Sequence, residues 1–158
     1  MPESKTAELA RKVPDFSAAA TSGDFRLSQL RGQMVVLYFY PKDNTPGCTT
    51  ESQEFAAASG RFAKAGATIV GVSRDSLSSH EKFRAKYELP FTLLSDPEEA
   101  LCTLFGVMKQ KNMYGKMVRG IERSTFLIDA QGVLRQEWRG VKIPGHVDAV
   151  LEAVKALA

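Results

Sequence analysis

The chain has 158 residues, a net charge of +3 and a pI near 8.9, with 44% hydrophobic and 25% charged residues. This length fits one domain, residues 1–158, and this composition is typical of a soluble globular protein. No apolar run is long enough to span a bilayer, and the N-terminal segment lacks the apolar stretch of a signal peptide. We therefore expect a cytoplasmic protein with no membrane partner.

The basic, cysteine and histidine residues exclude further classes of function. The densest basic segment, KQKNMYGKMVRG at residues 109–120, is short, so we interpret it as a solvated loop rather than a nucleic-acid surface. The two cysteines lack CxxC spacing, which argues against a disulfide framework, a zinc knuckle or a thioredoxin-type dithiol. Two histidines are too few for most metal sites. We expect neither a metal nor a nucleic-acid partner.

Apolar runs and turn residues predict a regular series of elements along the chain. They are a hairpin at 14–26, a strand at 34–40, a helix at 47–65, a strand at 67–73, a helix at 76–88, a strand at 91–95, a helix at 97–106, two strands within 124–138 and a helix at 146–158. Strand and helix alternation implies right-handed parallel crossovers, and the closing strands add antiparallel pairs. The pattern predicts a thioredoxin-like α/β fold with a central mixed sheet flanked by helices.

Cys48 lies where the strand at 34–40 gives way, through the loop PKDNTPG, to the next helix. The free N–H groups and the positive dipole end of a helix N-terminus favour a thiolate there. Cys48 also shares a helical stripe with Phe55 and Phe62, at intervals of seven, so the thiol should occupy a shallow, partly covered pocket facing the sheet. The competing interpretation is a small buried packing residue.

The loop itself favours a reactive cysteine. Pro41 and Pro46 stiffen it by fixing φ, and Gly47 permits close approach of the backbone. Thr45, three residues before Cys48, can direct its hydroxyl at the same pocket. These neighbours favour a reagent over a packing residue.

At this point the residues become recognisable. The spacing Pro41-x-x-x-Thr45-x-x-Cys48 resembles the active-site signature of peroxiredoxins, and YFYPKDNTPGCTTE is similar to their bacterioferritin-comigratory-protein (PrxQ) branch. VSRDSLSSHEKF, TLLSD, KNMYGK and GIERSTFLID resemble the same branch, so the likeness runs from about residue 14 to the end. It implies a thiol peroxidase that reduces hydrogen peroxide or organic hydroperoxides without metal, flavin or haem.

The resemblance also implies a role for each residue of the signature. Cys48 is the peroxidatic thiolate, Thr45 hydrogen-bonds the peroxide, and Pro41 shields the thiolate from water. The essential arginine of the family corresponds to Arg123 in IERSTFLID. These roles are expectations for the structure to place.

Strand order supports Arg123 independently of the resemblance. If the strand that follows it runs antiparallel to the strand at 34–40, Arg123 lies near Cys48, where a guanidinium stabilises a thiolate. The alternative is an exposed arginine at a strand end. Glu51, one helical turn after Cys48, either orients Arg123 or only complements the helix dipole.

The sequence departs from the branch in how the oxidised cysteine is reduced. Resolving cysteines of the branch correspond to Gln53 or Arg84, so both usual resolvers are absent. Cys102 is either a half-buried packing thiol or an unusual resolver that would pair with Cys48 after local unwinding. We predict a one-Cys cycle in a monomer, with thioredoxin, or glutathione with glutaredoxin, as external reductant.

Two other classes of function remain as alternatives. A Cys–His hydrolase needs a histidine beside Cys48, and neither His80 nor His146 lies in a segment that we expect to reach the pocket. A non-catalytic redox sensor would use the same reactive cysteine without turnover. Steady consumption of peroxide with a thiol donor distinguishes an enzyme from a sensor.

Overall fold

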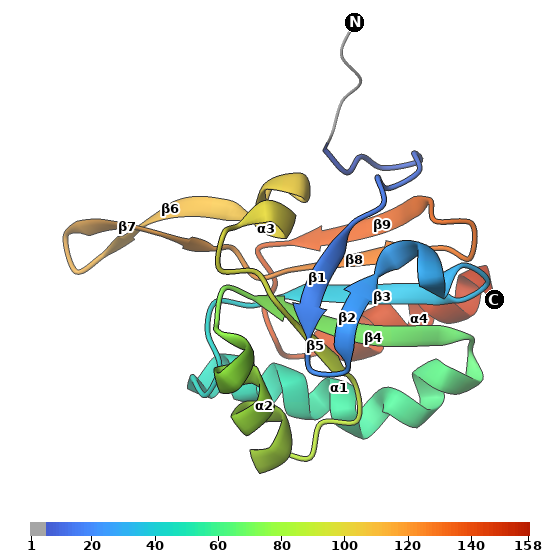
Figure 1. Ribbon diagram of the computed structural model, residues 1–158, viewed down its shortest axis with the longest axis horizontal. Helices are drawn as coiled ribbons and strands as arrows, with labels where there is room; N and C mark the ends of the chain where they lie inside the picture. The colour runs from blue at the N-terminus through green and yellow to red at the C-terminus, as the bar shows by residue number, and fades with distance from the viewer. Residues whose placement is uncertain (1–5) are drawn as a thin grey trace, which may run out of the picture.

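The computed structural model describes residues 6–158, and a seven-stranded mixed sheet forms its centre (Figure 1). In chain order the strands are β1 (Ser17–Ala20), β2 (Gly23–Arg26), β3 (Met34–Phe39), β4 (Ala67–Ser73), β5 (Thr92–Ser95), β8 (Ser124–Ile128) and β9 (Leu134–Arg139). Their spatial order is β2-β1-β5-β4-β3-β8-β9; β3, β4 and β5 are parallel and the remaining pairs antiparallel. The predicted thioredoxin-like fold is confirmed.

Of the four α-helices in residues 6–158, three begin and end close to the predicted residues. They are α1 (Pro46–Lys64), α2 (Leu77–Lys86) and α4 (His146–Leu157), and a short 3-10 helix (Leu27–Leu30) was not predicted. Gly66 follows α1 with a φ of 86°, a conformation that suits glycine after a helix. Within the described part of the chain, no helix combines the length and apolar character needed to cross a bilayer.

The third helix is shorter than the prediction of 97–106. Helix α3 spans only Ala100–Leu104, because Glu99 has a φ of 64° and leaves the helical region. Asp96 takes over the N-terminal end: its carboxylate accepts hydrogen bonds from the backbone N–H groups of Leu101 at 3.1 Å and Cys102 at 2.9 Å. Glu98 and Glu99, whose acidic side chains would suit a first helical turn, therefore lie before the helix.

The sheet separates two buried clusters. Because side chains alternate along a strand, neighbouring residues of β3 point to opposite faces. On one face Tyr38 belongs to a cluster with Phe55 of α1 and Val150 of α4. On the other face Leu37 belongs to a cluster with Leu101 of α3. The helix that carries Cys48 and the helix that carries Cys102 thus pack on opposite sides of the sheet.

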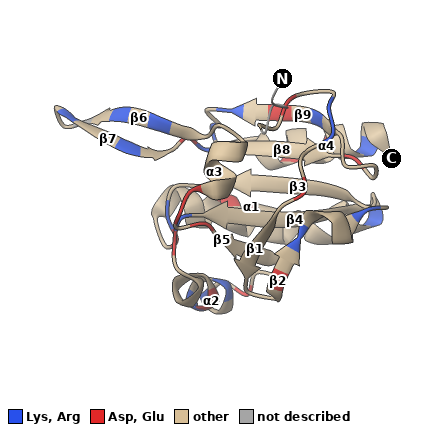
Figure 2. Cartoon of the chain, turned by 45° about the horizontal axis from the view of Figure 1, so that its top comes forward, with Lys and Arg blue, Asp and Glu red and all other residues tan. Residues whose placement is uncertain are grey.

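The segment interpreted as a solvated loop is instead an ordered hairpin, β6 (Met108–Met113) and β7 (Lys116–Ile121). This two-stranded arm projects from the body of the molecule (Figure 1), with basic residues along both strands (Figure 2). Tyr114, at its tip, is fully exposed. The prediction that this segment is exposed to solvent is confirmed, and the prediction that it is a loop is wrong.

Candidate active site

Strand β3 and helix α1 place Cys48 at the carboxyl end of the parallel strands. Thr45 is the N-cap residue of α1, Pro46 occupies the first helical turn, and Cys48 follows two residues later. The stripe of Cys48, Phe55 and Phe62 faces the sheet as predicted. Cys48 is only 1% exposed, so the thiol is more deeply covered than the shallow pocket expected from the sequence.

Arg123 contacts Cys48 directly. Strand β8 is antiparallel to β3 and pairs Ser124 with Phe39, which brings the residue before β8 to the end of β3. The Nη2 atom of Arg123 donates a hydrogen bond to Cys48 Sγ at 3.3 Å. The prediction from strand direction therefore agrees with the observed geometry. The guanidinium thus places a positive charge and a hydrogen-bond donor directly at the sulfur.

Glu51 holds the other side of the same guanidinium. Arg123 Nη1 donates to Glu51 Oε1 at 2.7 Å. Burial raises the pKa of Glu51 to about 7, although the positive charge of Arg123 opposes this rise. Burial alone would lower the pKa of Arg123, but the charges of Glu51 and Cys48 raise it, so the guanidinium keeps its proton. Among the described residues, Glu51 Oε2 has no hydrogen-bond partner.

Glycine at position 47 leaves room for this arrangement. A Cβ atom there would lie 3.3 Å from Arg123 Nη2 and 3.3 Å from a side-chain carbon of Ile143. Both distances are tighter than ordinary contacts. The sequence indicated that glycine at position 47 permits a close approach of the backbone. In the structure, the group that approaches the Gly47 backbone is the side chain of Arg123.

Thr45 and Pro41 lie in the loop that enters α1, and both are half-buried. The Oγ1 atom of Thr45 donates to the backbone carbonyl oxygen of Lys42 at 2.8 Å. Because this bond uses the hydroxyl hydrogen, the oxygen lone pairs of Thr45 remain able to accept a hydrogen bond from another group. The loop thus presents an oriented acceptor at the N-terminus of the Cys48 helix.

Cys102 is not brought to this site. It is fully buried in the cluster on the opposite face of the sheet. Burial raises the pKa of the Cys102 thiol well above its ordinary value, and the neighbouring carboxylate of Asp96 adds to the rise. These surroundings favour the protonated form of the Cys102 thiol.

His146 lies closer to the site than the sequence analysis expected. Its Nε2 atom is 2.8 Å from Thr125 Oγ1, and its ring packs edge-on against Phe55 and Trp138. Burial and the positive charge of Arg123 lower the pKa of His146 to about 4, so the ring is neutral at pH 7. Buried polar groups need hydrogen-bond partners, so Thr125 within an apolar strand is the signal in the sequence that could have indicated a buried polar residue such as His146 beside it.

Comparison with known proteins decides the family. The model of the AhpC/TSA family matches residues 9–137. The chain belongs to the AhpC/TSA family of peroxiredoxins, in its Bcp/PrxQ branch. It is 60% identical over 127 residues to peroxiredoxin Bcp of Xanthomonas campestris, covering 80% of this chain and 79% of that protein. Peroxiredoxin Bcp of Bacillus subtilis is 47% identical over 154 residues, covering 97% of this chain and 98% of that protein.

Solved peroxiredoxin structures agree with the fold. A structure of Xanthomonas campestris peroxiredoxin Q has a TM-score of 0.85 at 54% identity, covering 89% of this chain and 90% of that chain. A mutant of Xylella fastidiosa PrxQ has a TM-score of 0.90 at 41% identity, covering 98% and 99%. Trapped intermediate and ligand complexes of the Xanthomonas bacterioferritin comigratory protein, which address its alkyl peroxide reduction, have a TM-score of 0.85 at 53% identity, covering 90% and 91%. This peroxiredoxin is therefore a thiol peroxidase.

Proposed function

We propose that Cys48 reduces hydrogen peroxide and organic hydroperoxides in a one-Cys cycle. The thiolate attacks the hydroxyl oxygen of the hydroperoxide, the S–O bond forms, and the O–O bond breaks. Cys48 becomes a sulfenic acid, and the departing alkoxide or hydroxide takes a proton from water. The observation that carries this proposal is the contact of Arg123 Nη2 with Cys48 Sγ at 3.3 Å.

Each residue around Cys48 has a separate role in the reaction with peroxide. Arg123 stabilises the thiolate and the negative charge that develops on the leaving oxygen. Glu51 orients the guanidinium through its bond to Nη1. Thr45 accepts a hydrogen bond from the attacked hydroxyl, since its own hydrogen is committed to the loop carbonyl. Pro41 screens the thiolate from water. Orientation and fixed charge of this kind account for large accelerations in enzymes.

An external thiol completes the cycle. The thiol attacks the sulfenic sulfur, releases water and leaves a mixed disulfide, and a second thiol then restores Cys48. Thioredoxin, or glutathione with glutaredoxin, supplies such thiols in the cytoplasm, where we place this monomeric enzyme. The position of Cys102 on the opposite face of the sheet supports an external reductant over an internal one.

Oxidation with one equivalent of hydrogen peroxide, followed by mass spectrometric mapping of disulfides, tests the cycle. We expect sulfenic acid on Cys48 and no intramolecular disulfide until a thiol is added. Rapid formation of a Cys48–Cys102 bond in every molecule would replace the one-Cys cycle by a two-Cys cycle. Oxidation that occurs once and resists every thiol donor would favour a redox sensor.

A further inference from the structure

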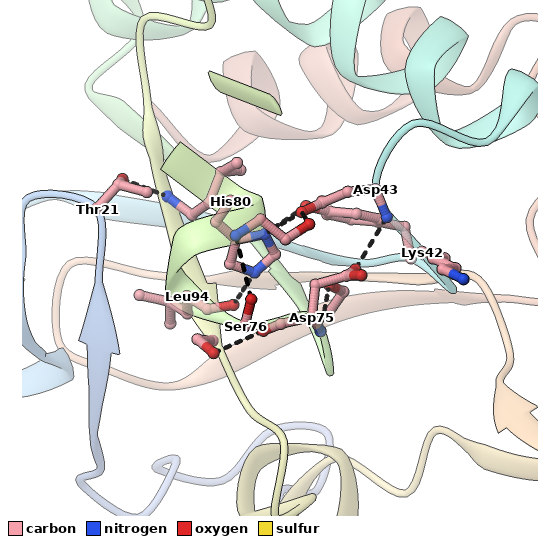
Figure 3. A network of polar contacts seen from close by, with 12 residues as sticks. Thr21, Lys42, Asp43, Asp75, Ser76, His80 and Leu94 are labelled. Atoms are coloured by element: carbon pink, nitrogen blue, oxygen red, sulfur yellow. Dashed lines mark hydrogen bonds and ion pairs between the residues drawn. The ribbon is translucent and has the colours of Figure 1, made fainter. Parts of the chain in front are cut away.

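Asp43 is a buried acid in the loop that carries Pro41 and Thr45. Its carboxylate accepts three side-chain hydrogen bonds: Oδ1 from the hydroxyl of Tyr40 at 2.6 Å, and Oδ2 from the hydroxyl of Ser79 at 2.9 Å and Nδ1 of His80 at 2.7 Å. Figure 3 shows Asp43 pointing from the loop toward His80. The Asp43 side chain is only 1% exposed, and its three hydrogen bonds restrict the position of the loop backbone at this residue.

The other partners in this network lie on rigid elements. His80 is in α2, and its Nε2 atom lies 2.7 Å from the carbonyl oxygen of Leu94 in β5, so both ring nitrogens are held (Figure 3). The backbone N–H of Asp43 donates to Asp75 Oδ2 at 2.9 Å, and Asp75 lies two residues after the end of β4. The loop is thus anchored twice at one residue, through the side chain and through the main chain.

A metal site is the competing explanation for this cluster. Ligand atoms of Asp43, Asp75 and His80 lie within 4.8 Å of one another. However, Asp43 Oδ2 already accepts hydrogen bonds from His80 and Ser79, and Asp75 Oδ2 accepts them from the Asp43 backbone and from Ser73. The observed contacts therefore form a complete hydrogen-bond network between protein groups.

We propose that Asp43 is a positioning residue for the peroxide reaction: through its bonds to α2 it sets the loop geometry that aims the Thr45 hydroxyl. The proposal rests on the proposed function, because it acts on the peroxide step at Cys48. Its physical link is short. Thr45 Oγ1 donates to the carbonyl of Lys42, and Lys42 directly precedes Asp43. Anchoring Asp43 therefore fixes the acceptor that orients the threonine.

The role of Asp43 differs from that of Arg123. Arg123 acts on the charge of the thiolate, so its loss affects every reaction of Cys48. Asp43 touches neither Cys48 nor Arg123 through any hydrogen bond described for residues 6–158. Its loss should impair the reaction that needs an oriented peroxide and spare a reaction that needs only a thiolate. Misplacement of a catalytic group by about 1 Å costs on the order of 100-fold in rate.

The test compares two reactions of Cys48 in a Cys102→Ser background, which leaves one thiol. Second-order rate constants are measured with hydrogen peroxide and with iodoacetamide. For Asp43→Asn we expect the peroxide-to-iodoacetamide ratio to fall roughly 10- to 100-fold. Asp96→Asn alters another buried aspartate, the one that caps α3, and should leave the ratio unchanged. Equal losses in both reactions, or no loss in either, would overturn the proposal.

A double-mutant cycle with Thr45→Val tests the path of action. If Asp43 acts through Thr45, Asp43→Asn should have little further effect once the hydroxyl is gone. Additive losses would contradict this. If Asp43→Asn does not fold, Ser79→Ala removes one bond to Oδ2, and we expect a roughly threefold fall in the ratio; an unchanged ratio would count against the proposal. The two proposals fail in different ways. If Thr45→Val by itself leaves the peroxide-to-iodoacetamide ratio unchanged, the role of Thr45 in the proposed function is refuted. If Thr45→Val lowers the ratio but Asp43→Asn does not, only the role of Asp43 is refuted.

Discussion

The two cysteines occupy contrasting surroundings in one fold. Both are buried, and both lie near the start of a helix. Cys48 lies in the first turn of a 19-residue helix and faces the guanidinium of Arg123. Cys102 lies in a five-residue helix, and a carboxylate oxygen of Asp96 already accepts its backbone N–H. Both thiols are therefore buried alike, and what differs is the sign of the neighbouring charge: a guanidinium at Cys48 and a carboxylate at Cys102.

The largest expected effect separates the two thiols themselves. Cys48→Ser should abolish peroxide consumption, because a serine hydroxyl does not ionise at neutral pH and forms no sulfenic acid. Cys102→Ser, the matched control, should retain turnover with an external thiol. Peroxide consumption is measured with dithiothreitol as the donor. Loss of turnover in Cys102→Ser alone would assign the resolving role to Cys102.

The next largest effect is expected when the positive charge beside Cys48, which Cys102 lacks, is removed by substitution. Arg123→Ala should slow the reaction of Cys48 with hydrogen peroxide by about 10²- to 10³-fold, because the thiolate and the leaving oxygen lose their hydrogen-bond donor. Stopped-flow kinetics under single-turnover conditions provide the rate. Arg135→Ala changes an arginine that pairs with Asp129 on the surface, so it serves as the control and should leave the rate unchanged. An unaltered rate in Arg123→Ala would remove this residue from the site.

The buried acid on the Cys48 side predicts a pH dependence of stability. The pKa of Glu51 rises to about 7 in the folded state, above its ordinary value of 4.5, so folding favours the protonated carboxyl. The contribution of Glu51 to the free energy of unfolding is therefore fully present below about pH 4.5 and is lost as the pH rises through about 7. The free energy of unfolding changes by roughly 3 kcal/mol over this range. Glu51→Gln should remove this part of the dependence. Urea unfolding between pH 4.5 and 8 measures the difference; parallel curves for the two proteins would contradict it.

The smallest effect concerns Cys102 as a packing residue. Cys102→Ser keeps a group that can donate to Asp96, so we expect a loss of only about 1 kcal/mol in the free energy of unfolding. Cys102→Ala removes that donor and leaves a small void, so its loss should be larger, about 2 kcal/mol. Urea unfolding of both variants at one pH tests the order. The reverse order would show that Asp96 gains nothing from a side-chain donor at this position.

The sequence predicted the sheet well because its central strands are continuous apolar runs. The strand predicted at 67–73 has those bounds in the structure. The hairpin of β6 and β7 was missed for a specific reason. Its turn places Tyr114 and Gly115 at positive φ, and a tyrosine is not among the residues that usually indicate such a turn. The segment around this turn is also mainly polar, so it lacks the alternation of apolar and polar residues from which a strand would have been predicted.

The candidate site was predictable where strand direction or a motif determined it. Arg123 follows from the antiparallel pairing of β3 and β8, and Glu51 follows from helical spacing after Cys48. The contact between Asp43 and His80 was not predictable, because it joins a loop to a helix 37 residues away. Nothing local to either residue specifies that pairing; only the packing of α2 against the loop does.

The antiparallel docking of β8 also has a consequence for the order of assembly. Cys48 and the arginine that supplies its positive charge are 75 positions apart, and the arginine lies in the last third of the chain. During synthesis from the N-terminus, Cys48 is made before Arg123. A partly made chain therefore carries the cysteine without its counter-charge. The contact between Cys48 and Arg123 therefore forms only after β8 has been made and has paired with β3.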